Sequence, residues 1–515
     1  MEFHLTNYTD YFSVQRTTVL ILLIVATYFF FLLQWRGTYW RRNHVDGPRA
    51  GLLFGNMFDF ISTRKHYGKV YEEIYRKYPD AEYVGFYTLL NEPAILVRSV
   101  DMVKEILVKQ FQKFHDNGVW IDENKDRLAA ENPFIARGNQ WKMTRNQLVS
   151  VFTPKKVRTV KSVFPHINEV CKTLDRYISQ KLCDHWEAKE LCSKYTLEVV
   201  ASCAYGIEGQ TFSNNSSDFS RLVEKLFQPR PFSIIETVSL LFSPIIGKLI
   251  KYRYVPKNIE NWLTTIIRKI IARREITNEP RNDFIQSILD LKNKKGENIS
   301  ELGIIGHCTT CLLEGFETSS TLMAFALYEL CMNPQIQKIV QHEIDAVFAK
   351  YNGELTYEAL TEMVYLENVL LETLRMHPAM YSLSKICTES TELPPQYKHS
   401  KNGIQIKRGT CVIIPVLAIH YDPILYANPN VFDPERFSEQ NQKKQNKFAF
   451  LAFGEGSRMC LGMRFGLAQS KAGLATILSK YKVYMSDRMK IPLEISTTTF
   501  LLSSKDGIWI KFLKR

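Results

Sequence analysis

Residues Phe453 to Gly462 read FGEGSRMCLG, a short glycine-rich loop that ends in a cysteine. Gly456 and Gly462 let the backbone approach a flat partner, because glycine has no side chain in the way. Cys460 is followed by the segment LGMRFGLAQSKAGLATIL, a predicted helix whose N-terminal dipole would help to keep the sulfur ionised. The loop therefore predicts a thiolate metal ligand at Cys460, with Arg458 placed to pair with a carboxylate.

Further motifs stand ahead of this loop. In LENVLLETLRMHP, Glu372 and Arg375 are three residues apart, so they share one face of a predicted helix and can form an ion pair. Arg436 follows in FDPERF. Residues 314–319 read EGFETS, and residues 141–145 read WKMTR.

This order of motifs resembles the cytochrome P-450 superfamily, whose signature Phe-x-x-Gly-x-Arg-x-Cys-x-Gly is met at every fixed position by FGEGSRMCLG. The stretches FHDNGVWIDENKDRLAAENPF (114–134) and VVASCAYGIE (199–208) resemble insect microsomal members of the family-six-like type. The resemblance runs from the N-terminal segment to the C-terminus. It implies the P-450 fold, mainly α with a small β portion.

The resemblance also implies heme b (iron protoporphyrin IX), with Cys460 as the axial ligand of the iron. It assigns heme binding to Trp141, Arg145, Gly315, Lys385, Phe453, Arg458 and Gly462. Lys385 stands where the family usually has Arg, so a propionate would meet a point charge instead of a bidentate fork. Glu317 and Thr318 would organise proton delivery to bound dioxygen. Glu372, Arg375 and Arg436 would form a buried charge network that fixes the Cys460 loop.

Glu314 departs from the family-six-like pattern, which usually has Ala at this place. It is four residues from Thr318, so both side chains point at the same space. Fatty-acid ω-hydroxylases of the superfamily carry Glu there, and in them it can form an ester to a heme methyl. The same ester is a hypothesis here. The alternative is a carboxylate paired with a nearby base or water, since an unpaired one in a dry pocket is unfavourable.

The N-terminal segment Thr17 to Trp35 is a nearly unbroken apolar run, TTVLILLIVATYFFFLLQW, long enough to cross a bilayer as a helix. Basic residues are concentrated after the run, which places the body of the chain in the cytosol. We therefore predict a lumenal tail (1–16), a transmembrane anchor (17–35), a basic, turn-rich linker (36–55) and a cytosolic heme-thiolate catalytic domain (56–515). A buried core helix and a cleaved signal peptide are the alternatives for the run.

The body of the chain shows mostly helical periodicity. The clearest predicted helices are Asp184–Ala204, Asn258–Thr277, Ile304–Met332 and Leu360–His377. The predicted strands are Glu82–Phe86, Ala94–Arg98, Gly403–Lys407 and Thr410–Pro415. Residues Ser239–Pro256 mix apolar and basic side chains, which fits either a helix that dips into a bilayer surface or a core helix.

The chain has 515 residues, a formal net charge of +13 and ten cysteines without a disulfide-framework spacing. No nucleic-acid motif accompanies the positive charge, so a bilayer and acidic proteins are the favoured partners and nucleic acid is not. Lys443, Lys444 and Lys447 fit either an acidic docking partner or a solvated loop.

The resemblance implies a membrane-bound monooxygenase of the endoplasmic reticulum (microsomes) that inserts one atom of dioxygen into a lipophilic small molecule such as a xenobiotic, hormone or fatty acid. NADPH would supply electrons through NADPH–cytochrome P-450 reductase, with cytochrome b5 as a second candidate donor. The alternatives are a P-450-type isomerase or dehydratase, and a non-catalytic heme protein that sequesters hydrophobic ligands. The predicted substrate lining is Val119, Phe134, Phe232, Leu313, Met380 and Phe500.

Overall fold

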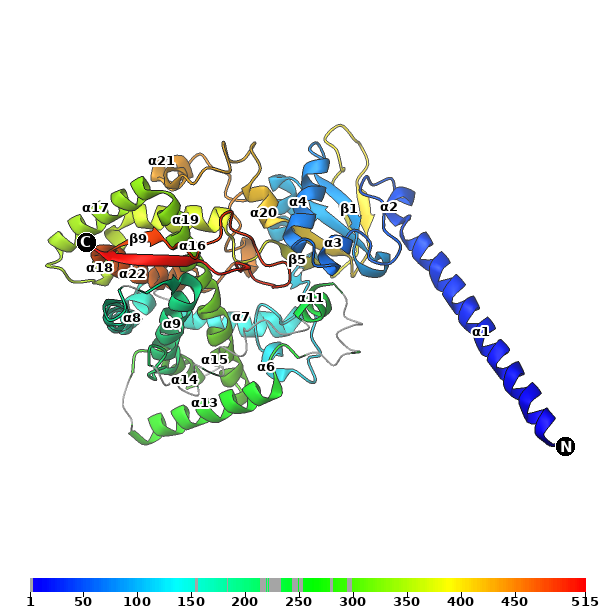
Figure 1. The fold of residues 1–515 in the computed structure, drawn as a ribbon, viewed down its shortest axis with the longest axis horizontal. Coiled ribbons are helices and arrows are strands. Elements are labelled where there is room, and N and C mark those ends of the chain that lie inside the picture. The colour runs from blue at the N-terminus through cyan, green and yellow to red at the C-terminus, as the bar shows by residue number, and fades with distance from the viewer. Residues whose placement is uncertain are drawn as a thin grey trace.

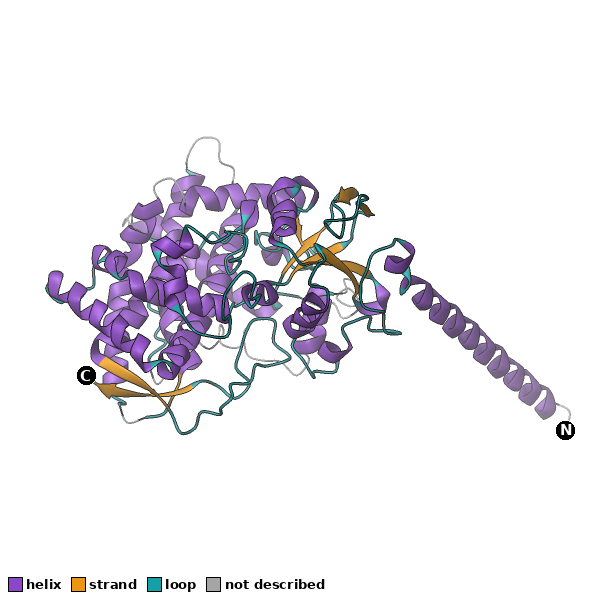
Figure 2. Cartoon of the chain, turned by 90° about the horizontal axis from the view of Figure 1, so that it is seen from above, coloured by secondary structure: helices purple, strands orange, loops and turns teal. Residues whose placement is uncertain are grey.

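The computed structural model describes the whole chain except residues 1–2, 153–155, 183, 214–218, 220, 222–232, 243–248, 250–252, 278–280 and 294–298. Most of the described chain forms a helical body, and the N-terminal helix α1 extends away from it (Figure 1). The strands lie in two places, one beside α1 and one at the C-terminus (Figure 2). The prediction of a mainly α fold with a small β portion is confirmed. Half of the surface segment expected over Ser239–Pro256 (residues 243–248 and 250–252) and the lining residue Phe232 fall outside the described residues.

The α-helices are, in chain order, α1 (Phe3–Arg36), α2 (Tyr39–Arg42), α3 (Phe58–Ile61), α4 (Tyr67–Lys77), α5 (Val100–Lys104), α6 (Arg127–Ala130), α7 (Gly138–Phe152), α8 (Lys156–Ser179), α9 (Ala188–Val200), α11 (Ser233–Leu241), α13 (Lys257–Thr277), α14 (Phe284–Lys292), α15 (Glu301–Gly315), α16 (Glu317–Met332), α17 (Pro334–Lys350), α18 (Tyr357–Glu362), α19 (Val364–Met376), α20 (Val416–His420), α21 (Glu439–Gln442) and α22 (Met463–Lys480). Shorter helical turns are η1 (Leu89–Asn91), η2 (Glu105–Lys109), η3 (Phe111–Lys113), η4 (Ala201–Tyr205), η5 (Pro434–Phe437) and η6 (Gly456–Arg458).

The largest sheet has the strand order β1-β2-β8-β5-β3. Its strands are β1 (Tyr83–Tyr87), β2 (Pro93–Val97), β8 (Cys411–Ile414), β5 (Leu383–Ile386) and β3 (Asp116–Asn117). Only β2 and β8 pair in parallel, with Ile95 opposite Val412. A second sheet has the order β4-β10-β9, from β4 (Trp186–Glu187), β10 (Trp509–Lys514) and β9 (Tyr481–Met485), and β6 (Thr391–Leu393) pairs with β7 (Ile404–Ile406).

Helix α16 lies at the centre of the body. It packs against α9, α19 and α22, and almost every residue from Ser319 to Leu330 is buried. A helix that is buried on all sides needs apolar or small residues all round, and the run STLMAFALYEL supplies them. This packing fixes the position of residues 314–318, where α15 ends and α16 begins, against α9 and α22.

The predicted helix over Ile304–Met332 is wrong in its middle, because the chain forms two helices that meet at Phe316. The Gln469 Nε2 amide donates to the Gly315 carbonyl at 2.8 Å, and the Thr318 Oγ1 hydroxyl donates to the Glu314 carbonyl at 3.1 Å. Side chains thus occupy carbonyls that backbone amides would otherwise use, which is a known cause of a helix kink. Periodicity alone does not report such insertions.

Two other predicted helices also need correction. The segment Asp184–Ala204 begins with strand β4, and helix α9 starts only at Ala188. The segment Leu360–His377 is divided between α18 and α19 at Met363. The four predicted strands are present within one or two residues, whereas six further strands of the described chain, namely β3, β4, β5, β6, β9 and β10, were not predicted.

The N-terminal apolar helix is attached firmly to the body. Gln15–Arg36 is the one stretch of the described chain that is long and apolar enough to cross a membrane. At its end Leu33 is buried, and the Asn91 Nδ2 amide donates to the Leu33 carbonyl at 3.0 Å. An ion pair of 2.8 Å joins Arg36 and Glu92. The segment that follows is also part of the folded body, since Trp40 is only 2% exposed.

Candidate active site

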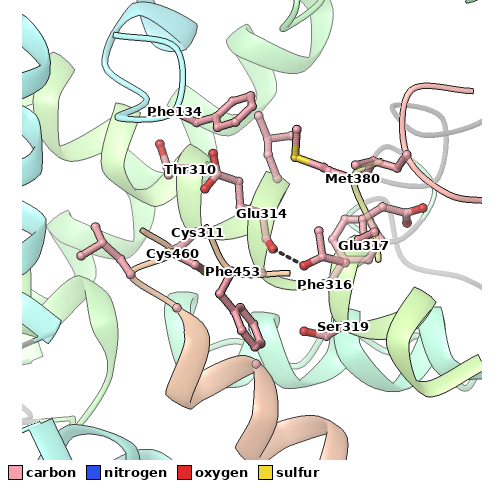
Figure 3. A pocket seen from close by; sticks show the side chains of 18 of the residues that line it. Phe134, Thr310, Cys311, Glu314, Phe316, Glu317, Ser319, Met380, Phe453 and Cys460 are labelled. Atoms are coloured by element: carbon pink, nitrogen blue, oxygen red, sulfur yellow. Dashed lines mark hydrogen bonds between the residues drawn. The ribbon is translucent and has the colours of Figure 1, made fainter. Parts of the chain in front are cut away.

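A cavity of about 1130 Å³ lies between the end of α15, the start of α16 and the Cys460 loop. Its lining contains every residue to which the sequence assigned a cofactor-binding or catalytic role, and five of the six predicted substrate-lining residues. Figure 3 shows Glu314, Phe316 and Glu317 on one side of this space and Phe453 and Cys460 on the other. Residues from distant parts of the chain therefore meet around one cavity.

The Cys460 loop is held in place by its own backbone. The Cys460 amide donates to the Phe453 carbonyl at 2.8 Å, and the amides of Gly462 and Met463 point at the sulfur and favour its ionised form. Burial has the opposite effect and raises the pKa of the thiol to about 11. The accessible surface of Cys460 faces the cavity, where a bound metal cation would deprotonate the thiol.

Gly456 is required for a different reason from the one predicted. Its φ of +75° lies in the left-handed region, and a Cβ there would come within 2.5 Å of the Leu107 carbonyl oxygen. The glycine therefore allows the loop to pack against η2, not against the cavity. At Gly462 an added Cβ would meet only the Cys460 sulfur at 4.0 Å.

Three cations gather at one end of the cavity. Arg145 donates from Nη2 to the Met459 carbonyl at 2.7 Å, and the Lys385 Nζ donates to the Asn117 Oδ1 at 2.7 Å. Arg458 donates to the carbonyls of Pro133 and Ala136 at 2.9 and 3.0 Å, and its guanidinium lies over the Trp141 ring. Burial lowers the pKa of Lys385 to about 7 and that of Arg458 to about 9.

This cluster of cations fits the two propionates of a heme. The buried Arg458 Nε and the neighbouring Trp141 Nε1 have no hydrogen-bond partner in the described part of the chain. Asp116 is a counter-ion, at 3.3 Å from the Arg458 Nη2. Buried donors and cations without enough acceptors are unfavourable, and carboxylates would satisfy them. The thiolate loop and the donor set together define the class of heme-thiolate proteins.

Comparison with known proteins agrees with this class. The sequence profile described as "Cytochrome P450" matches residues 45–510. The chain is similar to probable cytochrome P450 308a1 of Drosophila melanogaster, with 41% identity over 490 residues that cover 94% of this chain and 96% of that protein. It is 32% identical to probable cytochrome P450 6a13 of the same species over 93% of this chain and 95% of that protein, and 32% identical to cytochrome P450 6k1 of Blattella germanica over 93% of each.

The chain therefore belongs to the cytochrome P450 family. It is a P450 monooxygenase of the insect, family-six-like type, and membership in this family implies heme with a cysteine thiolate. The resemblance inferred from the motifs is confirmed.

Glu317 and Thr318 both line the cavity, but their side chains have different partners. The Glu317 carboxylate forms an ion pair of 2.9 Å with Lys189 of α9, and Lys189 also donates to the Ser320 hydroxyl at 2.8 Å. The Thr318 hydroxyl donates to the Glu314 carbonyl, the bond dashed in Figure 3. Lys189 was not identified from the sequence, because nothing in one sequence relates a lysine of α9 to an acid on α16.

Glu314 extends its carboxylate into the cavity, toward Phe134 and Thr310 in Figure 3. Burial raises the pKa of this carboxyl to about 7, while the amide of Asn132 and the charge of Arg145 act to lower it. Glu314 forms no ion pair among the described residues, and Arg145 is the base whose charge acts on it. The ester to a heme methyl stays a prediction.

The Glu372 network lies behind the cavity. Arg375 donates from Nε and Nη2 to the two Glu372 carboxylate oxygens at 2.7 and 2.8 Å, and both side chains are fully buried. Arg436 approaches the same carboxylate at 3.3 Å, and the Asp433 amide donates to it at 3.0 Å. The geometry expected for these three residues is present.

Proposed function

We propose that this chain is a membrane-bound monooxygenase that inserts one atom of dioxygen into a lipophilic small molecule. The observation that carries the proposal is that Cys460, Glu317 and Thr318 share one mainly apolar cavity. When bound, the heme iron would supply the oxygen chemistry, for which a thiolate ligand donates electron density. The residues of the chain hold this group, exclude water and position a proton.

The proposed roles follow from the contacts. Arg145, Lys385 and Arg458 would bind the heme carboxylates, with the Trp141 indole as a further donor, and Phe453 and Gly315 would border the heme. The Lys189 ammonium fixes the Glu317 carboxylate beside the cavity, so that Glu317 can pass a proton at its carboxylate oxygens. The Glu372–Arg375–Arg436 network would hold the chain that carries the Cys460 loop.

The proposed electron source is NADPH through NADPH–cytochrome P450 reductase, with cytochrome b5 as a second donor. The apolar helix α1 supports a place in the endoplasmic reticulum membrane, where the catalytic domain would face the cytosol. Lys444 and Lys447 are exposed and are candidates for contact with an acidic partner, whereas Lys443 already forms an ion pair with Glu439.

Reconstitution tests the proposal. Purified full-length protein loaded with heme in phospholipid, together with reductase and NADPH, should convert a lipophilic ligand into a product that contains one oxygen atom from labelled dioxygen. Omission of the reductase should abolish that product. Product formed without reductase would indicate an isomerase or dehydratase, and tight ligand binding without any product would indicate a sequestering protein, so either result contradicts the proposal.

Replacing Glu317 by Gln removes the carboxylate that pairs with Lys189 but keeps its volume. We expect product formation per heme to fall about 10²-fold, because proton transfer by a positioned group contributes about 10² to 10⁴-fold. Heme uptake should be unchanged. The matched control is Glu169→Gln, which removes an exposed carboxylate of α8 whose partner is Lys172 and which is not part of the cavity lining. Equal turnover of the two variants would show that Glu317 has no part in proton delivery.

A further inference from the structure

Of the two acids that the sequence placed near the reacting centre, Glu317 has an ion pair, whereas Glu314 has none in the described part of the chain, although the charge of Arg145 acts on it. The three cations Arg145, Lys385 and Arg458 lie at the end that fits the heme propionates, and Glu317 already has Lys189. Glu314 lines the same cavity, yet none of the described ion pairs includes it. A carboxylate in a site of low polarity is unfavourable unless a cation or several donors face it. A cationic group on a bound ligand would supply such a partner.

The surroundings of Glu314 provide two further contacts for such a ligand. Asn132 is only 2% exposed, and its Nδ2 amide has no partner at hydrogen-bond distance in the described part of the chain. The same amide lies near enough to Glu314 to lower the pKa of that carboxyl. Phe134, two residues further on, lines the same cavity, and the Glu314 carboxylate extends toward it in Figure 3. The face of an aromatic ring attracts a cation within about 6 Å.

The rest of the wall is mainly apolar, with Val119, Leu313, Met380 and Phe500 among its residues. A ligand that suits this cavity would thus combine a large apolar body with one positive charge. A fatty acid bound with its carboxylate beside Glu314 would instead bring two negative charges together, and like charges repel in a site of low dielectric constant.

We propose that Glu314 is a specificity-determining residue that selects lipophilic cations, that is, substrates with an ammonium group attached to an apolar body. This inference deepens the proposed function, since it names the substrate class of the same cavity. It requires that the Glu314 carboxyl group is not esterified and carries a negative charge when the ligand is bound. An ester between Glu314 and a heme methyl would leave the residue without a negative charge and would remove the basis of the selection.

A matched pair of ligands tests the inference. The first is a trimethylammonium ion that carries a 4-phenylbutyl chain, and the second is the neutral molecule in which carbon replaces the nitrogen. A quaternary nitrogen has no lone pair, so it cannot bind to the iron, and the two ligands differ in charge at nearly the same shape. Equilibrium dialysis of the heme-loaded, full-length protein in neutral phospholipid gives the dissociation constant of each.

We expect Glu314→Gln to weaken binding of the cation about tenfold or more, which corresponds to the loss of a desolvated charge pair, and to leave the neutral ligand within about twofold. Glu314→Asp, which keeps the charge, should retain most of the preference. The control is Glu362→Gln, which removes a carboxylate of α18 that pairs with Lys350 outside the cavity lining and should change neither constant.

The inference is overturned if the wild-type protein binds both ligands equally, or if Glu314→Gln weakens both to the same extent. It is also overturned if heme released under denaturing conditions carries a bond to the protein, as mass spectrometry would show. Heme uptake and the spectrum of the reduced carbon monoxide complex are recorded on the same samples. If heme uptake and the spectrum are normal but the two ligands bind with equal affinity, the result would contradict the substrate class while leaving the proposed monooxygenase function intact.

Discussion

Replacing Cys460 by Ser should abolish monooxygenase turnover and change the spectrum of the reduced carbon monoxide complex. A serine hydroxyl is a far weaker ligand than a thiolate and does not donate comparable electron density to the iron. The backbone should tolerate the change, because the Gly462 and Met463 amides near the sulfur can also donate to a hydroxyl oxygen. Product formation should fall to background, measured with reductase and NADPH at equal protein concentration.

Another cysteine of the chain provides the control. Cys331→Ser alters a half-buried thiol at the far end of α16, which is not part of the cavity lining. It should leave both the spectrum and the turnover unchanged. A Cys460→Ser protein that kept the thiolate-type spectrum would refute the assignment of the axial ligand.

Replacing Glu372 by Gln should lower the free energy of unfolding by about 3 to 5 kcal/mol, because it leaves the fully buried Arg375 guanidinium without its carboxylate. Arg375 would still donate to the carbonyls of His420 and Pro429, but neutral acceptors do not compensate a buried charge. Chemical denaturation of the heme-loaded protein measures the change. Arg436→Gln should cost less, since Arg436 is partly exposed and lies 3.3 Å from Glu372.

The matched control for Glu372→Gln is Glu439→Gln. It breaks an ion pair with Lys443 on a short surface helix, where the two side chains are 84% and 72% exposed. Exposed pairs contribute about 0 to 1 kcal/mol, so we expect almost no change in unfolding. Similar losses for Glu372→Gln and Glu439→Gln would mean that the buried network adds nothing beyond an ordinary surface ion pair.

Local features of the site could be predicted from the sequence because their residues are close together along the chain. Glu372 and Arg375 share a helix face at a spacing of three, and the geometry of that spacing does not depend on the rest of the fold. The ten residues of the Cys460 loop include both the glycines that shape its turns and the cysteine that supplies the sulfur. The kink at Phe316 was missed, because its cause is the side chain of Gln469, far away in α22.

The sequence by itself determined the family, the apolar N-terminal helix and the acidic residue at position 314, and it predicted the ligand cysteine, since each depends on residue type and short spacing. Only the tertiary structure decided that Lys189 neutralises Glu317, that Asn132 lies beside Glu314, and that Glu314 has no ion pair among the described residues. The physical reason is that these relations arise from the packing of α9 and the loop before α7 against α15 and α16. Residues far apart in the chain acquire partners only when helices pack, and the charge balance of a cavity is the sum of such contacts.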